Sequence, residues 1–141
     1  MRYSVIRAGM VAALLCLAAV TGHSATPNSA GLVVPRFSRE LPNVPGKSMI
    51  AVEVTFAPGQ VSPPHRHAKS ACIFAYVLSG AIRSQVEGQP AKVYHAGEFW
   101  FEDPGAHHIQ AANMSKTKPA KLLAVFVVDA SDKELTSVDP Q

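Results

Sequence analysis

Short apolar segments alternate with proline- and glycine-rich turns along most of the chain, and this rhythm restricts the folds that it can form. The chain has eleven prolines and nine glycines, and β-branched and aromatic residues dominate the segments between them. None of these segments carries the period of a long amphipathic helix. The pattern therefore predicts an all-β sandwich or barrel. The expected strands are 32–37, 48–56, 72–78, 81–87, 91–95, 98–102, 107–112 and 121–129.

The N-terminus has the pattern of a secretory signal peptide. Arg2 and Arg7 precede an uncharged apolar run, 8–20, which is shorter than the roughly 20 residues that span a bilayer. Small residues follow this run, and we expect cleavage within 22–25. This interpretation makes the protein periplasmic or secreted, without a stable membrane anchor. The alternative is that the run forms a membrane anchor or a buried helix.

Composition limits the rest of the chain to one domain with few classes of partner. The 141 residues, 48% of them hydrophobic, are enough for a single apolar core. The formal charge of +3 includes two leader arginines, so the exported part is almost neutral and gives no case for nucleic-acid binding. The predicted division is a signal peptide (1–25), a linker (26–31), a β-domain (32–130) and a C-terminal tail (131–141). We expect the tail to form one helical turn or to fray.

Histidines one residue apart follow a pair of prolines. In a strand, His65 and His67 project from the same face, and two imidazoles at that spacing can converge on one metal ion. A second strand, starting after the turn at 103–105, carries His108 and Gln110 on one face. If the two strands are neighbours, His108 completes a three-histidine face.

These histidines belong to two longer motifs, which together resemble the two motifs of the cupin superfamily. The parts that carry the resemblance are Gly59, His65-Arg66-His67, the segment YVLSG (76–80), the segment GEFWFEDPGAHH (97–108) and Asn113. The resemblance implies a double-stranded β-helix, a relative of the jelly roll. It also implies that His65, His67 and His108 are metal ligands at the centre of the barrel, and that a homodimer is expected.

One ligand of the cupin pattern is missing from the first motif. The family's glutamate lies seven residues before the glycine that closes the motif, and counting back from Gly80 gives Ile73. A β-bulge would turn Cys72 inward instead. A cysteine in an apolar strand is, however, more often an inert core residue than a ligand.

Glu102 is a second candidate for the missing oxygen, because it precedes the turn that leads to His108. Strand alternation favours a different interpretation, in which Phe99 and Phe101 face the core. Glu98, Trp100 and Glu102 then face outward, and an exposed Trp100 indicates a dimer contact.

Three neutral imidazoles define the chemistry that the site is expected to support. They suit Fe, Mn, Ni, Cu or Zn as a divalent ion and leave coordination positions open for a small molecule. The pocket wall is expected to include Phe74, Val77 and Phe126, with Tyr76 and Gln110 as polar contacts.

Two functions and one functionless alternative follow from this site. The resemblance implies a metal-dependent, dioxygenase-like enzyme or an isomerase that acts on a small organic acid, phenol or diketone-like compound. The alternative from a different class is a non-catalytic module that binds a metal or a small ligand. A third reading is a barrel whose histidines no longer bind anything.

Overall fold

The structure is a computed structural model, and it describes residues 31–140. The predicted signal peptide (1–25) and all of the predicted linker (26–31) except Gly31 lie outside the described residues. Within 31–140, no helix has the length and apolar character needed to cross a lipid bilayer.

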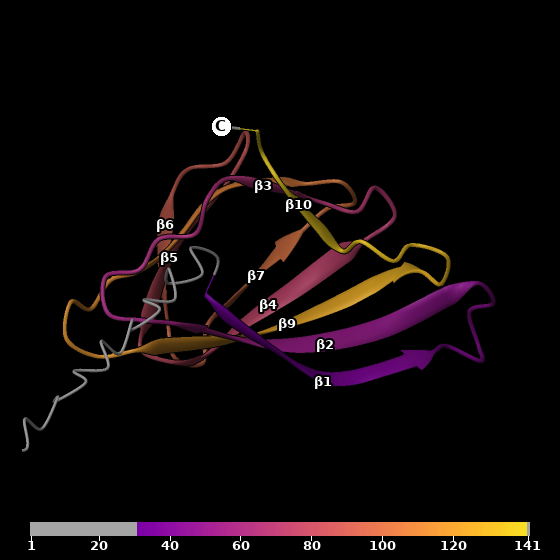
Figure 1. Cartoon of the computed structure of the whole chain (residues 1–141), viewed down its shortest axis with the longest axis horizontal. Helices are drawn as coiled ribbons and strands as arrows, with labels where there is room; N and C mark the ends of the chain where they lie inside the picture. The colour runs from indigo at the N-terminus through magenta and orange to yellow at the C-terminus, as the bar shows by residue number, and fades with distance from the viewer. Residues whose placement is uncertain (1–30, 141) are drawn as a thin grey trace, which may run out of the picture.

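Ten antiparallel strands arranged in two five-stranded sheets make up the described part of the chain (Figure 1). The first sheet has the order β1-β2-β9-β4-β7, and the second has the order β10-β3-β8-β5-β6. The first five strands are β1 (Leu32–Glu40), β2 (Lys47–Phe56), β3 (His65–His67), β4 (Cys72–Ser79) and β5 (Ala81–Val86). The remaining five are β6 (Lys92–His95), β7 (Phe99–Glu102), β8 (His107–Asn113), β9 (Ala120–Asp129) and β10 (Thr136–Val138).

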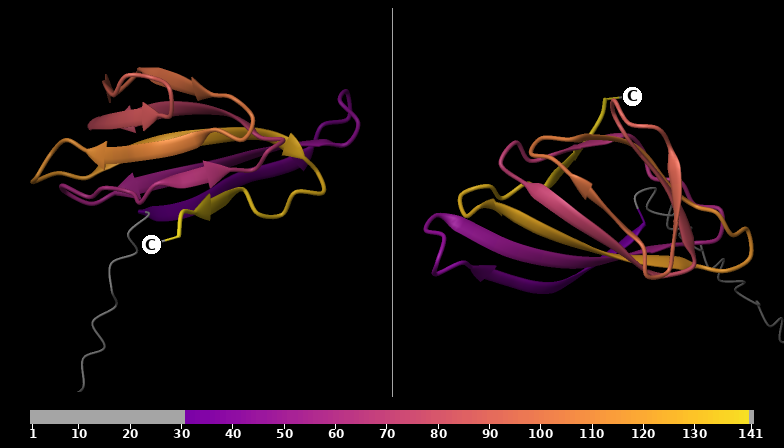
Figure 2. Two further views of the ribbon diagram at one scale, coloured as in Figure 1. Left: turned by 90° about the horizontal axis from the view of Figure 1, so that it is seen from above. Right: turned by 180° about the vertical axis from the view of Figure 1, so that it is seen from behind.

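Both sheets bury one face against a common interior, around which the strands wrap (Figure 2). In β9 every second side chain is buried, from Ala120 to Val128, as expected for a strand with one face in a core. Ile82 of β5 belongs to the same core from the opposite sheet. This arrangement confirms the predicted all-β, double-stranded β-helix fold.

A glycine makes the corner between the two sheets at the end of β4. Gly80 has φ of +76°, which L side chains rarely adopt, and a Cβ at this position would lie 2.9 Å from the Cβ of Ala120. Gly80 therefore allows the chain to leave the first sheet at β4 and enter the second at β5 while packing closely against β9.

The orientation predicted for β7 is wrong. Trp100 and Glu102 are buried, with exposures of 7% and 2%, whereas Phe99 and Phe101 are 58% and 51% exposed. The register between β4 and β7 explains the difference, because Glu102 pairs with Ile73, whose side chain points inward. A shift of one residue moves every side chain of a strand to the opposite face. Because β7 has aromatic residues on both faces, its sequence alone does not indicate which face is buried.

The C-terminal tail forms a strand where a helical turn or fraying was expected. β10 pairs with β3, and Thr136 lies opposite His67 in this pairing. The tail is therefore part of the second sheet and lies beside the predicted site.

Candidate metal centre

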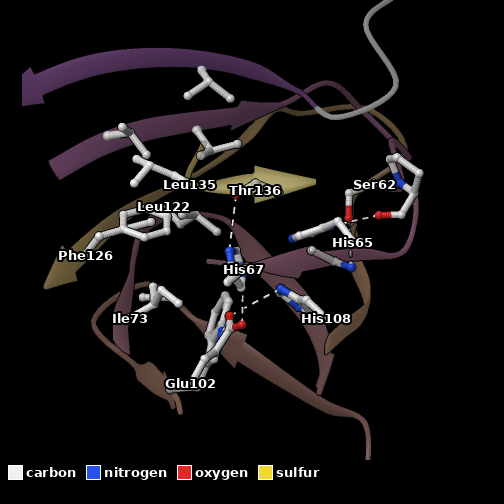
Figure 3. Close-up of a pocket in the computed structure, with 18 of the residues that line it drawn as sticks. Ser62, His65, His67, Ile73, Glu102, His108, Leu122, Phe126, Leu135 and Thr136 are labelled. Carbon is white, nitrogen blue, oxygen red and sulfur yellow. Dashed lines mark hydrogen bonds and ion pairs between the residues drawn. The ribbon is translucent and has the colours of Figure 1, made fainter. Parts of the chain in front are cut away.

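Two neighbouring strands bring the three predicted histidines together. β3 pairs with β8 so that His65 lies directly opposite His108, and His67 follows two residues later on the same face. One ring nitrogen from each histidine lies within 4.8 Å of those from the other two. The ring centroid of His65 is 5.0 Å from that of His67 and 5.0 Å from that of His108. The structure thus forms the three-histidine face that the motifs predicted (Figure 3).

One nitrogen of each histidine ring is held by a hydrogen bond to a neighbouring residue. His65 donates from Nδ1 to the Pro63 carbonyl at 2.9 Å, and Nδ1 of His67 lies 3.2 Å from the Thr136 hydroxyl. Nε2 of His108 and the hydroxyl of Ser84 form a hydrogen bond of 2.9 Å. Each ring thereby keeps one nitrogen for the centre of the cluster, as in metal sites whose ligands are oriented by outer hydrogen bonds.

Glu102 reaches the histidine cluster from β7 of the first sheet. Its Oε2 lies 3.1 Å from Nε2 of His67, and its Oε1 lies 3.2 Å from Nδ1 of His108. Trp100 donates a hydrogen bond of 2.9 Å from Nε1 to the same Oε1. The carboxylate therefore contacts two of the three histidines and is held by a buried indole.

Two buried polar atoms at this site have no hydrogen-bond partner. They are Nε2 of His67 and Oε2 of Glu102, which face each other without the geometry of a hydrogen bond. Buried polar atoms are rarely left unsatisfied, because desolvation without a partner costs about 1–3 kcal/mol for each group. A cation between these two electron-pair donors would satisfy both, so the residues present fit a bound metal ion.

The charge states of the side chains also suit a cation. Burial lowers the pKa of His65, and it lowers the pKa of His108 to about 4 despite the opposing attraction of the Glu102 carboxylate. Burial alone would raise the pKa of Glu102, but its contacts with His67 and His108 outweigh burial and lower that pKa. At neutral pH the site therefore combines neutral imidazoles of His65 and His108 with an ionised carboxylate.

The histidine cluster forms one end of an apolar cavity of about 330 Å³. Side chains of β2 and β9 line the other end, together with Ile73 and Leu135 (Figure 3). Among them is Phe126, whose ring also packs edge-on against His67 with centroids 5.7 Å apart. A cavity of this size, apolar except at one end, suits a small molecule with one polar group directed at the histidines.

Three residues predicted for the pocket or its surroundings lie elsewhere. Cys72 and Tyr76 are on the outer face of β4, and Sγ of Cys72 faces the Val127 carbonyl at 3.8 Å.

Gln110 also does not line the cavity, because the pairing of β8 with β5 shifts register between Gln85 and Val86. This irregularity breaks the alternation after His108. Of the predicted wall, Phe126 faces the cavity, whereas Phe74 points outward with Tyr76 and Val77 is buried in the core without lining the cavity. Ile73, a candidate for the position of the missing glutamate, does line the cavity.

Two residues that support the site, Ser84 and Thr136, were not predicted from the sequence. Ser84 carried a weak signal, because it is a polar residue at an inward position between Ile82 and Val86. Thr136 carried none, since it lies 69 residues from His67 in the chain and in a segment predicted to be a tail.

Solved structures with the same arrangement of strands include proteins of several kinds. An uncharacterised protein with a double-stranded β-helix domain from Klebsiella pneumoniae is 16% identical, with a TM-score of 0.62, and the match covers 83% of this chain and 90% of that chain. A recombinant oxalate oxidase in complex with glycolate is 26% identical, with a TM-score of 0.58, over 83% of this chain and 58% of that chain. The DMSP lyase DddQ from Ruegeria pomeroyi is 21% identical, with a TM-score of 0.52, over 64% of this chain and 42% of that chain.

Sequence comparison points to the same fold. The chain spans about half the length of the two enzymes. A comparison with curated protein sequences gives no significant match. Residues 52–126, more than half of the chain, match the family model described as "Cupin domain". The protein therefore belongs to the cupin family.

Proposed function

We propose that the protein binds a divalent metal ion through His65, His67 and His108, and uses it as an oxygenase or isomerase on a small organic substrate. The observation that carries the proposal is the three-histidine cluster at the polar end of an otherwise apolar cavity. When bound, the metal supplies Lewis-acid polarisation and open coordination positions. Imidazole ligands suit Fe, Ni, Cu and Zn alike, and Mn is tested beside them.

The chain's own residues would position both the ion and the substrate. Hydrogen bonds to Pro63, Thr136 and Ser84 orient the three imidazoles before an ion arrives, so little side-chain entropy is lost on binding. The apolar end of the cavity excludes water and holds the hydrocarbon part of a substrate. A substrate with one anionic or chelating group and a compact apolar body fits both ends.

Similar structures support an activity on a small molecule. Oxalate oxidase and DMSP lyase, by their names, act on small molecules and share this fold with the chain. Because the chain spans only part of either enzyme and lies at or below 26% identity to them, neither activity is assigned to it. We infer a substrate of comparable size, such as a small organic acid, phenol or diketone.

A non-catalytic binding function is the second candidate, and one observation favours it. Apart from the histidines and Glu102, the polar side chains that line the cavity are Ser62 and Thr136. Ser62 accepts a hydrogen bond from the Ala111 amide, and Thr136 contacts His67. The described part of the cavity thus holds no further carboxylate or amine for proton transfer, as expected for a module that only binds.

Metal content and turnover together test the proposal. Purified protein is stripped with a chelator, reloaded with each of the five metals, and assayed for bound metal and for turnover and oxygen consumption with small acids, phenols and diketones. We expect stoichiometric metal in the wild type and in His95→Ala, an exposed control histidine, but not in His65→Ala. Equal trace metal in wild type and His65→Ala would refute metal binding. Stoichiometric metal without turnover would favour the binding module.

A further inference from the structure

A side chain from the first sheet reaches the histidine cluster of the second sheet. Glu102 of β7 is the cross-strand partner of Ile73 of β4, and both side chains face the cavity. Opposite residues in an antiparallel pair have Cβ atoms about 4.5–5.5 Å apart. A long side chain on one strand can therefore reach the space next to the opposite residue on the other strand. A carboxylate on β7 is therefore close to the space in front of Ile73.

The separation of Glu102 and His67 fits two ligands of one ion, and the two atoms lack the geometry of a hydrogen bond. Two atoms that each lie about 2.1 Å from one ion are about 3.0 Å apart at a right angle and about 3.4 Å apart at a tetrahedral angle. Oε2 of Glu102 is 3.1 Å from Nε2 of His67, and neither atom has a hydrogen-bond partner. If Nε2 of His67 donated its proton to Glu102, this nitrogen would have no lone pair for a metal.

The surroundings of the carboxylate leave Oε2 available for an ion. Oε1 accepts the hydrogen bond from Trp100, which holds the carboxylate in one orientation. Glu102 is 2% exposed, and none of the described residues that line the cavity is a lysine or an arginine. A buried carboxylate is costly unless a cation compensates its charge, and a metal ion at the cluster would do so.

We propose that Oε2 of Glu102 is a fourth metal ligand, supplied from β7. This inference rests on the proposed metal binding by the three histidines. It changes the electrostatics of the site, because a divalent ion with three neutral imidazoles has a charge of 2+, whereas the added carboxylate reduces that charge to 1+. Fewer positions then remain open, and anionic ligands are attracted less strongly.

Co²⁺ binding to the full-length protein tests the assignment, because the visible absorption of Co²⁺ reports the number and geometry of its ligands. The variants are Glu102→Gln, which keeps shape but removes the charge, and Glu40→Gln, which removes the charge of an exposed glutamate at the end of β1. We expect at least a tenfold loss of Co²⁺ affinity and an altered spectrum for Glu102→Gln, with both properties unchanged for Glu40→Gln. Should Glu102→Gln not fold, Glu102→Asp is judged by the same two readouts.

The outcomes separate this inference from the proposed function. If the wild type and His65→Ala both fail to bind Co²⁺ stoichiometrically, metal binding itself is wrong. If the wild type binds and His65→Ala does not, the histidine site stands, and Glu102 alone is in question. Glu102 is then not a ligand if Glu102→Gln keeps the wild-type spectrum, whether or not its affinity falls.

Discussion

The two ends of the cavity differ in the kind of interaction that builds them. At the histidine end, His65, His67 and His108 come from β3 and β8 of the second sheet, and each ring nitrogen has a specific partner or faces the centre. At the apolar end, side chains of β2 and β9 of the first sheet pack without directional contacts. The histidine end therefore depends on the positions of single atoms, whereas the apolar end depends on the volume of its side chains. Substitutions at the two ends should therefore affect different measurements.

Loss of a histidine should have the largest effect, and it should fall on metal affinity. His65→Ala removes a ligand, so we expect its loss of affinity to exceed the roughly 100-fold that loss of a supporting hydrogen bond costs. Competition with a coloured chelator measures this affinity. His95→Ala, at an exposed position, should bind as the wild type does, and comparable losses in both variants would contradict the distinction.

Loss of volume at the apolar end should affect stability and leave the metal in place. Leu122 is 5% exposed and lines the cavity, so Leu122→Ala should lower the free energy of unfolding by about 2–5 kcal/mol. Urea denaturation of the metal-free protein measures this change. Metal affinity should stay within about threefold of the wild type, and a larger loss would show that the two ends are not independent.

Acid should destabilise the metal-free protein through the histidine end. The pKa of His108 is about 4 in the folded protein against 6.5 in the unfolded chain, so the unfolded state takes up the proton first as the pH falls. The free energy of unfolding should therefore decrease between pH 6.5 and pH 4, by on the order of 3 kcal/mol from this group, and be unaffected by it above pH 6.5. His65 acts in the same direction.

Urea denaturation at pH 7 and pH 4.5, with chelator present, checks this pH dependence. His108→Gln should show a smaller difference between the two pH values than the wild type, whereas exposed His95→Gln should show the wild-type difference. Equal pH dependence in all three proteins would mean that His108 is not the group responsible.

Removal of a supporting hydroxyl should have the smallest effect. Thr136→Val keeps the shape of the side chain but removes the contact with Nδ1 of His67, and we expect about a tenfold loss of metal affinity. Isothermal titration with Zn²⁺ measures it, with Ser137→Ala on the same strand as the control. Unchanged affinity in Thr136→Val would show that β10 does not orient His67.

The sequence predicted the three histidines but not the residues that hydrogen-bond to them. The histidines are predicted by short motifs, whereas their partners depend on contacts between distant parts of the chain. The i, i+2 spacing of His65 and His67 determines that both project from one face, and the motif around His108 determines the second strand. The pairing of β3 with β10 joins Thr136 to a histidine far away in the chain, and no local pattern indicates it.

Orientation was the hardest property to predict for strands with apolar residues on both faces. In β7, aromatic residues alternate with Trp100 and Glu102, so either face could be buried, and the pairing of Glu102 with Ile73 decides it. The irregularity that turns Gln110 away from the cavity likewise depends on the partner strand β5. Register between strands is a long-range property, and it determines which carboxylate reaches the histidines.

The position of a bound ion is the decisive test of the metal centre and of its fourth ligand. Crystals of the Zn²⁺-loaded protein, measured at the absorption edge of zinc, would show the ion by its anomalous scattering. We predict one strong peak in the cavity, about 2.1 Å from a nitrogen of His65, His67 and His108 and from Oε2 of Glu102. A peak bonded to the histidines but not to Glu102 would contradict the fourth ligand. The absence of a peak at the histidines, in crystals that contain Zn²⁺, would contradict the metal centre itself.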